Sequence, residues 1–241
     1  MNVIEYKESF LDVQSQTLCL VMEYASKGDV LKKIEGHFKR STCFPEYELW
    51  SAMIQCLCGL KALHDLNVMH RDIKCANIII SGKGECKLAD FNVSKVVNQK
   101  EGFLYTQTGT PYYASPEVWK DRPYDFKSDI WSLGCVLYEM ASLRPPFKAQ
   151  DMNGLYKKVV SAQYPPISSR YSSDFREIIS MMLQPNPNLR PTTDQILNLS
   201  VMQARIQQLK LFDPNIEASI NSFNLPINDE STSGAHADNH L

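Results

Sequence analysis

Two acids, one ammonium group and one amide occupy positions from which they could act together on a phosphate. Asp72, Lys74 and Asn77 fall within one short stretch, and Asp90 follows an apolar run further along the chain. A carboxylate can accept a proton, a lysine can face an anion, and carboxylate and amide oxygens are donors that Mg²⁺ accepts. Any one of these acids alone is better explained as a helix cap or a surface carboxylate. Their combination predicts chemistry on a metal-bound phosphate.

The motifs around these residues resemble those of the protein kinases. They are His70-Arg71-Asp72-Ile73-Lys74-Cys75-Ala76-Asn77, Asp90-Phe91-Asn92 and Ser115-Pro116-Glu117. Phosphoryl transfer in such enzymes depends on positioning and on cations placed over the developing charge. The resemblance implies that Asp72 accepts the hydroxyl proton and that Lys74 faces the γ-phosphate of ATP. It further implies that Asn77 and Asp90 hold Mg²⁺.

The segment between these motifs resembles serine/threonine kinases rather than tyrosine kinases, on the basis of Lys74 and of Gly109-Thr110-Pro111-Tyr112-Tyr113. By that resemblance Thr110 is a catalytic residue that bridges the acid and the lysine and shapes the acceptor site. Thr106 fits an activation-loop phosphorylation site, where a phosphate would recruit Arg71 and order the loop. The alternative is that the hydroxyls of this loop are simply solvated.

Three further residues take supporting roles by the same resemblance. Glu117 is expected to pair with Arg190 and so to fasten the activation segment to the helical lobe, an arrangement that is better evidence for geometry than for stability. Asp129 is expected to accept hydrogen bonds from the backbone of the catalytic loop. As an acid near a predicted helix start, Asp129 could also serve the helix dipole, and the two roles are compatible.

Longer segments resemble the NIMA-related kinases in particular. They are residues 90–95, 109–140, 164–167 and 201–209. This resemblance implies a cytoplasmic Ser/Thr kinase that acts on protein substrates in cell-cycle, microtubule, centrosomal or ciliary settings. Cytoskeletal or centrosomal partners, and the centrosome, cilium or nucleus as further locations, follow from the resemblance alone.

By the same resemblance, residues 20–25 correspond to the strand and hinge that hold adenine in kinases. Met22 would guard the back of the nucleotide pocket, and backbone groups of Glu23 and Ala25 would hydrogen-bond the base. Ile79 would touch the base from below. Ordinary core packing explains the same apolar residues, and the sequence leaves both explanations open.

Part of the kinase pattern has no counterpart in this sequence. The Gly-rich loop, the strand lysine and the helix glutamate would precede Val3, and Gly82-Lys83-Gly84 is typical of a turn instead. We therefore expect the chain as written to bind Mg-ATP weakly and to transfer phosphate poorly, and we interpret it as a truncated form of a complete kinase. The alternative is a non-catalytic kinase-like module that binds partners through its helical lobe.

The resemblance to the protein kinases implies an α+β, protein-kinase-like fold that consists mostly of the helical large lobe, and the pattern of apolar residues predicts its strands and helices. We expect a remnant of the small lobe with the hinge over residues 1–25, the large lobe over 26–212, and a polar, disordered tail over 213–241. Predicted strands are residues 3–10, 17–24, 78–80 and 86–88. Predicted helices are residues 28–38, 45–67, 127–142, 151–161, 173–183 and 192–199, with 201–212 as a possible continuation of the last.

Composition places limits on the class of protein. The 241 residues are 44% hydrophobic and 22% charged, with a net charge of −2, which suits one soluble globular body. No block of Lys or Arg marks a surface for nucleic acid or membrane, although the net charge leaves room for a basic groove that takes acidic substrates. No apolar stretch could span a bilayer and no secretory signal precedes the first strand. Seven cysteines without a Cys-x-x-Cys pair predict a reducing compartment rather than a disulfide or zinc framework.

Overall fold

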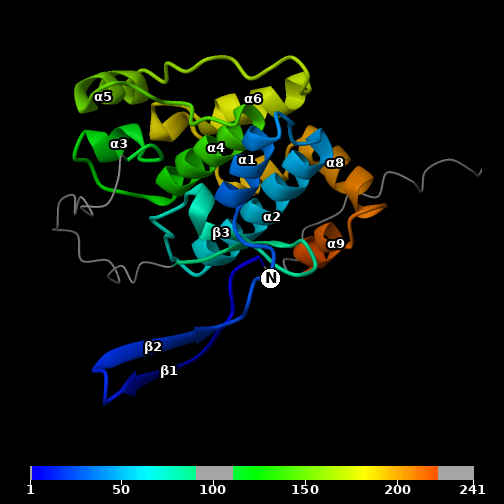
Figure 1. Ribbon diagram of the computed structural model, residues 1–241. Helices are drawn as coiled ribbons and strands as arrows, with labels where there is room; N and C mark the ends of the chain where they lie inside the picture. The colour runs from blue at the N-terminus through cyan, green and yellow to red at the C-terminus, as the bar shows by residue number, and fades with distance from the viewer. Residues whose placement is uncertain (1, 91–110, 222–241) are drawn as a thin grey trace, which may run out of the picture.

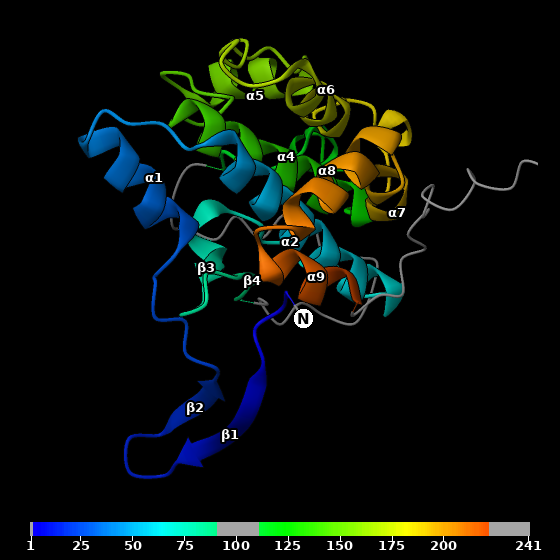
Figure 2. The same cartoon turned by 90° about the vertical axis from the view of Figure 1, so that its right-hand side faces the viewer.

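The computed structural model describes residues 2–90 and 111–221. A helical body carries one β-hairpin that projects away from it (Figure 1, Figure 2). The strands are β1 (Tyr6–Asp12), β2 (Thr17–Met22), β3 (Ile78–Ile80) and β4 (Cys86–Leu88). The helices are α1 (Val30–Lys39), α2 (Glu46–Asp65), α3 (Pro116–Trp119), α4 (Phe126–Ser142), α5 (Met152–Val160), α6 (Ser173–Met182), α7 (Thr193–Leu197), α8 (Ser200–Lys210) and α9 (Pro214–Asn221), with short 3-10 helices η1 (Cys75–Asn77) and η2 (Pro187–Leu189).

Two long helices, α2 and α4, pack against each other at the centre of the body (Figure 1). Both are apolar on most of their circumference, and Leu57 of α2 and Trp131 and Leu133 of α4 are completely buried. A helix with apolar residues on all sides belongs in the interior of a protein. Helix α6 contacts α4, and α7, α8 and α9 contact α2, so that one continuous core supports the whole body.

The N-terminus of α4 is fixed by a capping box. The Oδ1 atom of Asp125 accepts hydrogen bonds from the backbone N–H groups of Lys127 at 2.8 Å and Ser128 at 3.2 Å. The backbone N–H of Asp125 in turn donates to the Ser128 hydroxyl at 3.4 Å. Reciprocal bonds of this kind satisfy the orphan amides of a first helical turn. They also place Asp129 at a defined position inside that turn.

Strands β3 and β4 form an antiparallel hairpin in which Ile78 pairs with Leu88, and the strands predicted at residues 78–80 and 86–88 are confirmed. The strand predicted over residues 3–10 is wrong at its start. Val3 forms a parallel bridge to β4, and β1 begins only at Tyr6. The backbone at Asn2 passes very close to Gly59 of α2. A Cβ on Gly59 would lie 2.5 Å from the carbonyl oxygen of Asn2, so only glycine fits at this position.

The β1–β2 hairpin has no covering layer among the described residues. Its strands are antiparallel, with Tyr6 opposite Met22, and β2 ends two residues before the predicted end. Phe10 is 51% exposed and Leu18 is 64% exposed, on a ribbon that extends away from the helices in both views (Figure 1, Figure 2). Because a two-stranded ribbon is marginally stable by itself, this element contributes little to the stability of the body.

The expectation of a disordered tail from Asp213 onward is wrong for residues 214–221, which form helix α9. Ile216 and Ile220 are buried, and α9 packs against α2 and α8 (Figure 2). The carboxylate of Asp213 accepts a hydrogen bond from the Ser51 hydroxyl of α2 at 2.6 Å. Two isoleucines four residues apart supply an apolar stripe on an otherwise polar segment, and mean composition does not register such a stripe.

The segment predicted as an extension of the last domain helix forms a separate helix. Helix α7 ends at Leu197, and Leu199 has extended backbone angles as the residue that precedes α8. None of the helices in the described part of the chain is long and apolar enough to cross a membrane.

Candidate active site

The catalytic loop, residues 70–77, is held to α4 by the buried carboxylate of Asp129. Asp129 accepts hydrogen bonds from the backbone N–H groups of His70 and Arg71, each at 3.0 Å. It also accepts one from the Tyr124 hydroxyl at 2.7 Å and contacts Nε2 of His64 at 3.0 Å. Burial alone would raise the pKa of Asp129, but the hydrogen bonds from His64 and Tyr124 outweigh it and hold the pKa below its ordinary value. The carboxylate is therefore charged and fixes the path of the loop.

Arg71 has a backbone conformation that the loop must hold in place. Its φ angle is 68°, in the left-handed region that non-glycine residues seldom adopt. The bond from its N–H to Asp129 lies at this strained position. Strain of about 1–3 kcal/mol persists only where surrounding contacts over-determine the backbone, and it is common at functional sites.

Two of the predicted catalytic side chains of this loop, Lys74 and Asn77, contact the carboxylate of the third, Asp72. The Nζ of Lys74 lies 2.7 Å from Oδ2 of Asp72. The Nδ2 of Asn77 donates to the same Oδ2 and to the carbonyl oxygen of Asp72, both at 2.8 Å. The Asn77 amide nitrogen is thus directed to Asp72, which leaves its amide oxygen as the group suited to a metal ion. Asp72 is left with one fixed orientation beside a cation.

Strand pairing brings Asp90 to the same end of the β3–β4 hairpin as Asn77. Ile78, next to Asn77, pairs with Leu88, and the N–H of Ala89 donates to the carbonyl oxygen of Asn77 at 2.9 Å. Asp90 follows directly, is exposed, and has a φ angle of 59°. The backbones of Asn77 and Asp90 therefore lie close together at one end of the hairpin.

The hinge residues lie partly apart from this loop. Met22 ends β2 and is 48% exposed, so that the described residues do not place it at the back of a closed pocket. The carboxylate of Glu23 pairs with Lys87 of β4 at 2.6 Å, and Ala25 is partly buried. Ile79 is partly exposed between two buried neighbours on β3, because successive side chains of a strand point to opposite faces. Ile79 is therefore not a fully buried core residue, and its contact with adenine stays a prediction.

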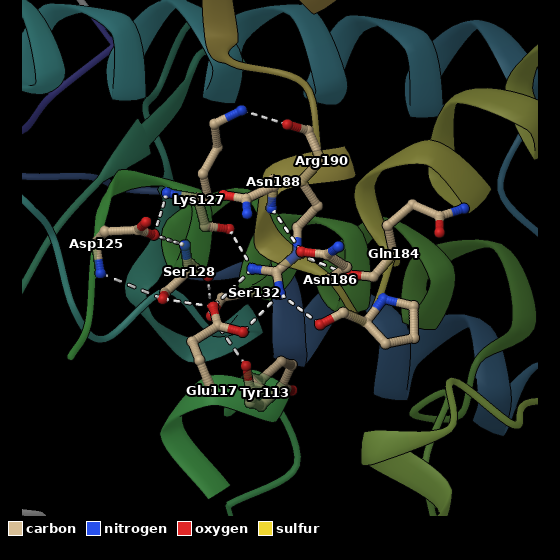
Figure 3. A network of polar contacts seen from close by, with 11 residues as sticks. Tyr113, Glu117, Asp125, Lys127, Ser128, Ser132, Gln184, Asn186, Asn188 and Arg190 are labelled. Carbon is tan, nitrogen blue, oxygen red and sulfur yellow. Dashed lines mark hydrogen bonds and ion pairs between the residues drawn. The ribbon is translucent and has the colours of Figure 1, made fainter. Parts of the chain in front are cut away.

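The structure brings Glu117 and Arg190 together in a buried bidentate ion pair (Figure 3). The two guanidinium–carboxylate distances are 2.7 Å and 2.6 Å, and the Ser128 hydroxyl donates to the same carboxylate at 2.7 Å. Burial raises the pKa of Glu117, but the hydrogen bond and charge of Arg190 outweigh it and lower the pKa below its ordinary value. Arg190 also lies over the ring of Trp131, at 5.2 Å from the ring centre. Helix α3, which follows the activation segment, is thus tied to α4 and η2.

The buried carboxylate of Glu139 was not found by reasoning from the sequence. Glu139 of α4 accepts a hydrogen bond from the Tyr113 hydroxyl at 2.7 Å and contacts the Cys75 sulfur at 3.4 Å. Burial is the main cause that raises the pKa values of the Tyr113 hydroxyl and the Cys75 thiol, so both stay protonated as donors. Since Cys75 follows Lys74, this carboxylate links the catalytic loop to the segment after Thr110. An acid inside an otherwise apolar helix was the available signal.

Comparisons with known proteins agree with this geometry. Residues 1–202 match the protein kinase domain. The chain belongs to the protein kinase family. It is 38% identical to the serine/threonine-protein kinase Nek1 of Mus musculus over 217 residues, which cover 90% of this chain and 18% of that protein. It is 40% identical to the probable serine/threonine-protein kinase nek3 of Dictyostelium discoideum over 225 residues, 91% of this chain and 20% of that protein. Identity to human Nek5 is 39% over 197 residues, 81% of this chain and 27% of that protein.

These comparisons confirm the predicted resemblance to the NIMA-related kinases. The kinase domain described here spans less than a third of the length of each of these three relatives. The kinase-like α+β fold expected from the sequence is confirmed as well, with the helical large lobe as its main part.

The donor set of this kinase domain fits Mg²⁺. Among residues 2–90 and 111–221, no group of three or more His, Cys, Asp or Glu could hold a metal ion. Asn77 and Asp90 offer one hard oxygen donor each, and Mg²⁺ commonly takes only one or two protein ligands and completes its shell with water and substrate phosphates. These two residues suit a metal that arrives with a nucleotide.

Two predicted residues of the kinase domain lie outside the described part. They are Thr110, predicted to bridge Asp72 and Lys74, and Thr106, predicted as the phosphorylation site. Their roles stay predictions from the sequence.

Proposed function

We propose that this chain carries the catalytic lobe of a serine/threonine protein kinase, which transfers the γ-phosphate of ATP to Ser or Thr hydroxyls of a protein substrate. One observation carries the proposal: the side chains of Lys74 and Asn77 both meet the Asp72 carboxylate within 2.8 Å, on a loop whose backbone Asp129 holds. A carboxylate oriented in this way can receive a proton from a substrate hydroxyl.

In the proposed reaction, Asp72 orients the acceptor hydroxyl and takes its proton as the hydroxyl oxygen bonds to the γ-phosphorus. The bond from that phosphorus to the bridging oxygen breaks, and ADP leaves with the electron pair. Lys74 places a positive charge beside the transferring group, where negative charge develops. Bound Mg²⁺ would neutralise charge on the phosphates, and Asn77 and Asp90 are the residues that would hold it.

Nucleotide contacts are the weaker part of the proposed site. Met22 is half exposed, and the apolar hairpin that would face adenine lacks a covering layer in the described chain. We therefore propose that the chain as given binds Mg-ATP weakly and phosphorylates slowly. The same exposure favours the second candidate function, a non-catalytic module that binds partners through its helical lobe.

The test is a phosphorylation assay on the purified chain with γ-labelled ATP and dephosphorylated casein. We expect slow transfer to Ser and Thr, reduced about 10²–10⁴-fold by Asp72→Asn, which keeps the shape of the side chain and removes its basicity. Equal transfer by both proteins would contradict the assignment of Asp72. If the purified chain transfers no phosphate at all, that result would favour the binding module instead.

The cellular setting is a further proposal, supported by the family resemblance and by the state of the cysteines. All seven cysteines are free thiols, and five of them are buried. Free buried thiols suit a reducing compartment, so we propose the cytoplasm, with centrosomal or cytoskeletal partners. Imaging of a fluorescently tagged chain together with a centrosome marker tests the location, and a secreted or lumenal signal would contradict it. Phosphorylation of Thr106 is tested by mass spectrometry of the protein isolated from cells.

A further inference from the structure

A small basic groove lies between α1 and the end of β3, outside the candidate active site. Its volume is about 310 Å³, and its lining residues are Lys27, Lys32, Lys33, Gly36, Arg40 and Ile80. Helix α1 and strand β3 lie side by side in both views of the fold (Figure 1, Figure 2). We refer to this feature as the α1 groove. None of the residues assigned to phosphoryl transfer lines it.

The α1 groove has more positive than negative charge. Lys33 pairs with Glu48 at 2.6 Å, and Lys32 pairs with Asp29 at 3.3 Å. Lys27 and Arg40 line the same groove and form no ion pair with any residue of the described chain. Two of the four cations are therefore free to receive an external anion.

The electrostatic effect of these cations reaches a neighbouring histidine. Burial is the main cause that lowers the pKa of His37, and the positive charges of Arg40 and Lys33 lower it further, whereas Glu48 raises it. The charges of Arg40 and Lys33 therefore act on His37 in the direction expected of a positive surface. A positive field at this surface is consistent with the uncompensated side chains.

A glycine gives the groove its shape. A Cβ on Gly36 would lie 3.3 Å from one terminal nitrogen of Arg40 and 3.4 Å from the other, so the guanidinium lies directly over the helix backbone. Glycine inside a helix is less favourable than alanine, and no turn or positive φ angle requires it here. Across the groove, Lys27 reaches the β3–β4 turn, where its Nζ lies 3.8 Å from the position of a Cβ on Gly84. Cations from two separate elements therefore face one space.

We propose that the α1 groove is a docking site for an acidic segment of a partner protein, with Asp or Glu side chains bound by Lys27 and Arg40. The apolar side chain of Ile80 at the base suits the methylene groups of such side chains. The groove is small and the whole chain has a net charge of −2, whereas nucleic acids and anionic membranes require a broad basic surface. The proposal does not depend on phosphoryl transfer, because docking requires neither ATP nor Asp72.

The test measures binding of a fluorescein-labelled octaglutamate peptide to the full chain by fluorescence anisotropy, without nucleotide. The groove variant is Lys27→Glu/Arg40→Glu. The matched control is Lys120→Glu/Arg144→Glu, which makes the same change of charge at two exposed cations that do not line the groove. An exposed ion pair changes affinity about 1.5- to 5-fold, and a reversed charge adds repulsion of similar size. We therefore expect at least about fivefold weaker binding by the groove variant and less than about twofold change in the control.

Several outcomes would overturn the proposal. Equal binding by the wild-type chain and the groove variant would place the peptide elsewhere, and undetectable binding of octaglutamate would exclude an acidic peptide. Groove-dependent binding of phosphatidylserine vesicles or of polyuridylate, without binding of octaglutamate, would assign the groove to a membrane or to RNA instead. Circular dichroism checks that each variant is folded, and Lys27→Gln/Arg40→Gln replaces the reversal if folding is lost. Since no ATP is present, failure here is distinguishable from failure of the proposed kinase activity.

Discussion

The two sides of the proposed nucleotide site rest on very different supports. The catalytic loop is bonded to α4, whose central residues are completely buried, whereas the hinge continues from a hairpin whose apolar side chains are about half exposed. On the first side, Asp72 and Asn77 are held in place because their loop is hydrogen-bonded to Asp129 of the buried helix α4. On the second, β2, which ends at Met22, pairs with β1 alone among the described strands. The residues proposed for proton transfer and those proposed for nucleotide binding therefore rest on different parts of the structure.

This contrast has a physical origin in how much surface each element buries. A helix such as α2 buries apolar side chains on all sides and gains free energy with each of them. The strands of the β1–β2 hairpin form hydrogen bonds with each other, but the apolar side chains on the ribbon stay exposed. The hairpin therefore gains little stabilising free energy beyond its backbone hydrogen bonds. We therefore expect core mutations in the helical body to cost much stability, and mutations in the β1–β2 hairpin to cost little.

The largest expected effect follows from removal of a buried charge partner in the body. Arg190→Ala leaves the Glu117 carboxylate buried without its partner, and we expect a loss of about 3–5 kcal/mol of unfolding free energy. Chemical denaturation measures this loss. The control is Glu48→Gln, which breaks the exposed pair with Lys33 and should cost no more than about 1 kcal/mol. Similar costs for both variants would contradict the structural role of the Glu117–Arg190 pair.

The second prediction compares one substitution at two sites. Leu57→Ala in α2 removes a completely buried side chain and should cost about 2–5 kcal/mol, because a cavity remains in a packed core. Leu18→Ala in β2, where the side chain is 64% exposed, should stay within about 0.5 kcal/mol. Urea denaturation of the two variants gives both values. A cost at Leu18 close to that at Leu57 would mean that the hairpin is covered in solution.

The third prediction concerns the bond that ties the segment after Thr110 to the buried Glu139 carboxylate of α4. Tyr113→Phe removes the hydroxyl that donates to the buried carboxylate of Glu139, and we expect a loss of about 1–3 kcal/mol. Tyr156→Phe is the matched control, since Tyr156 lies on the surface, and it should change stability by less than about 0.5 kcal/mol. Thermal melts of both variants at one pH are sufficient. No difference between them would show that the Tyr113 hydroxyl contributes nothing.

The same contrast explains which parts of the fold could be predicted from the sequence. Local signals succeeded for strands β3 and β4, because the short segments Ile78–Ile80 and Cys86–Leu88 flank a Gly-containing turn and have few other arrangements. They failed for Val3, whose partner is the distant strand β4, and for α9, whose two isoleucines acquire meaning only against α2 and α8. Pairing between distant segments depends on tertiary contacts, which local periodicity does not contain.

For the site, the sequence indicated residue types but not the direction of their contacts. The motif predicted Asp72, Lys74 and Asn77 as a set, yet only the structure shows that the Asn77 amide nitrogen points to Asp72. Glu139 was missed because an apolar helix pattern was interpreted as core throughout. A buried acid needs a donor, and its donors lie in two other segments of the chain.

The smallest expected effect concerns the response of two carboxylates to salt. The hydrogen bond and the charge of Lys7 lower the pKa of Glu5, which lies fully in solvent at the base of the hairpin. At about 1 M salt the screening length falls to about 3 Å, so the pKa of Glu5 should rise towards its ordinary value. Asp129 is completely buried and its pKa is lowered by hydrogen bonds, so it should not respond. Carboxyl chemical shifts measured by NMR across a pH titration distinguish the two.

The pH dependence of the unfolding free energy gives a second test of the difference between Asp129 and Glu5. Because the folded-state pKa of Asp129 lies below the unfolded value of about 3.9, its contribution is complete above that pH and is lost as pH falls through the folded pKa. The acid-induced loss of unfolding free energy should therefore persist at about 1 M salt, when exposed pairs are screened. Asp129→Asn should flatten that loss, whereas Glu5→Gln should leave it unchanged. If high salt abolished the acid sensitivity of the wild-type chain, exposed charges such as Glu5, rather than the carboxylate under the catalytic loop, would set the acid stability of this protein.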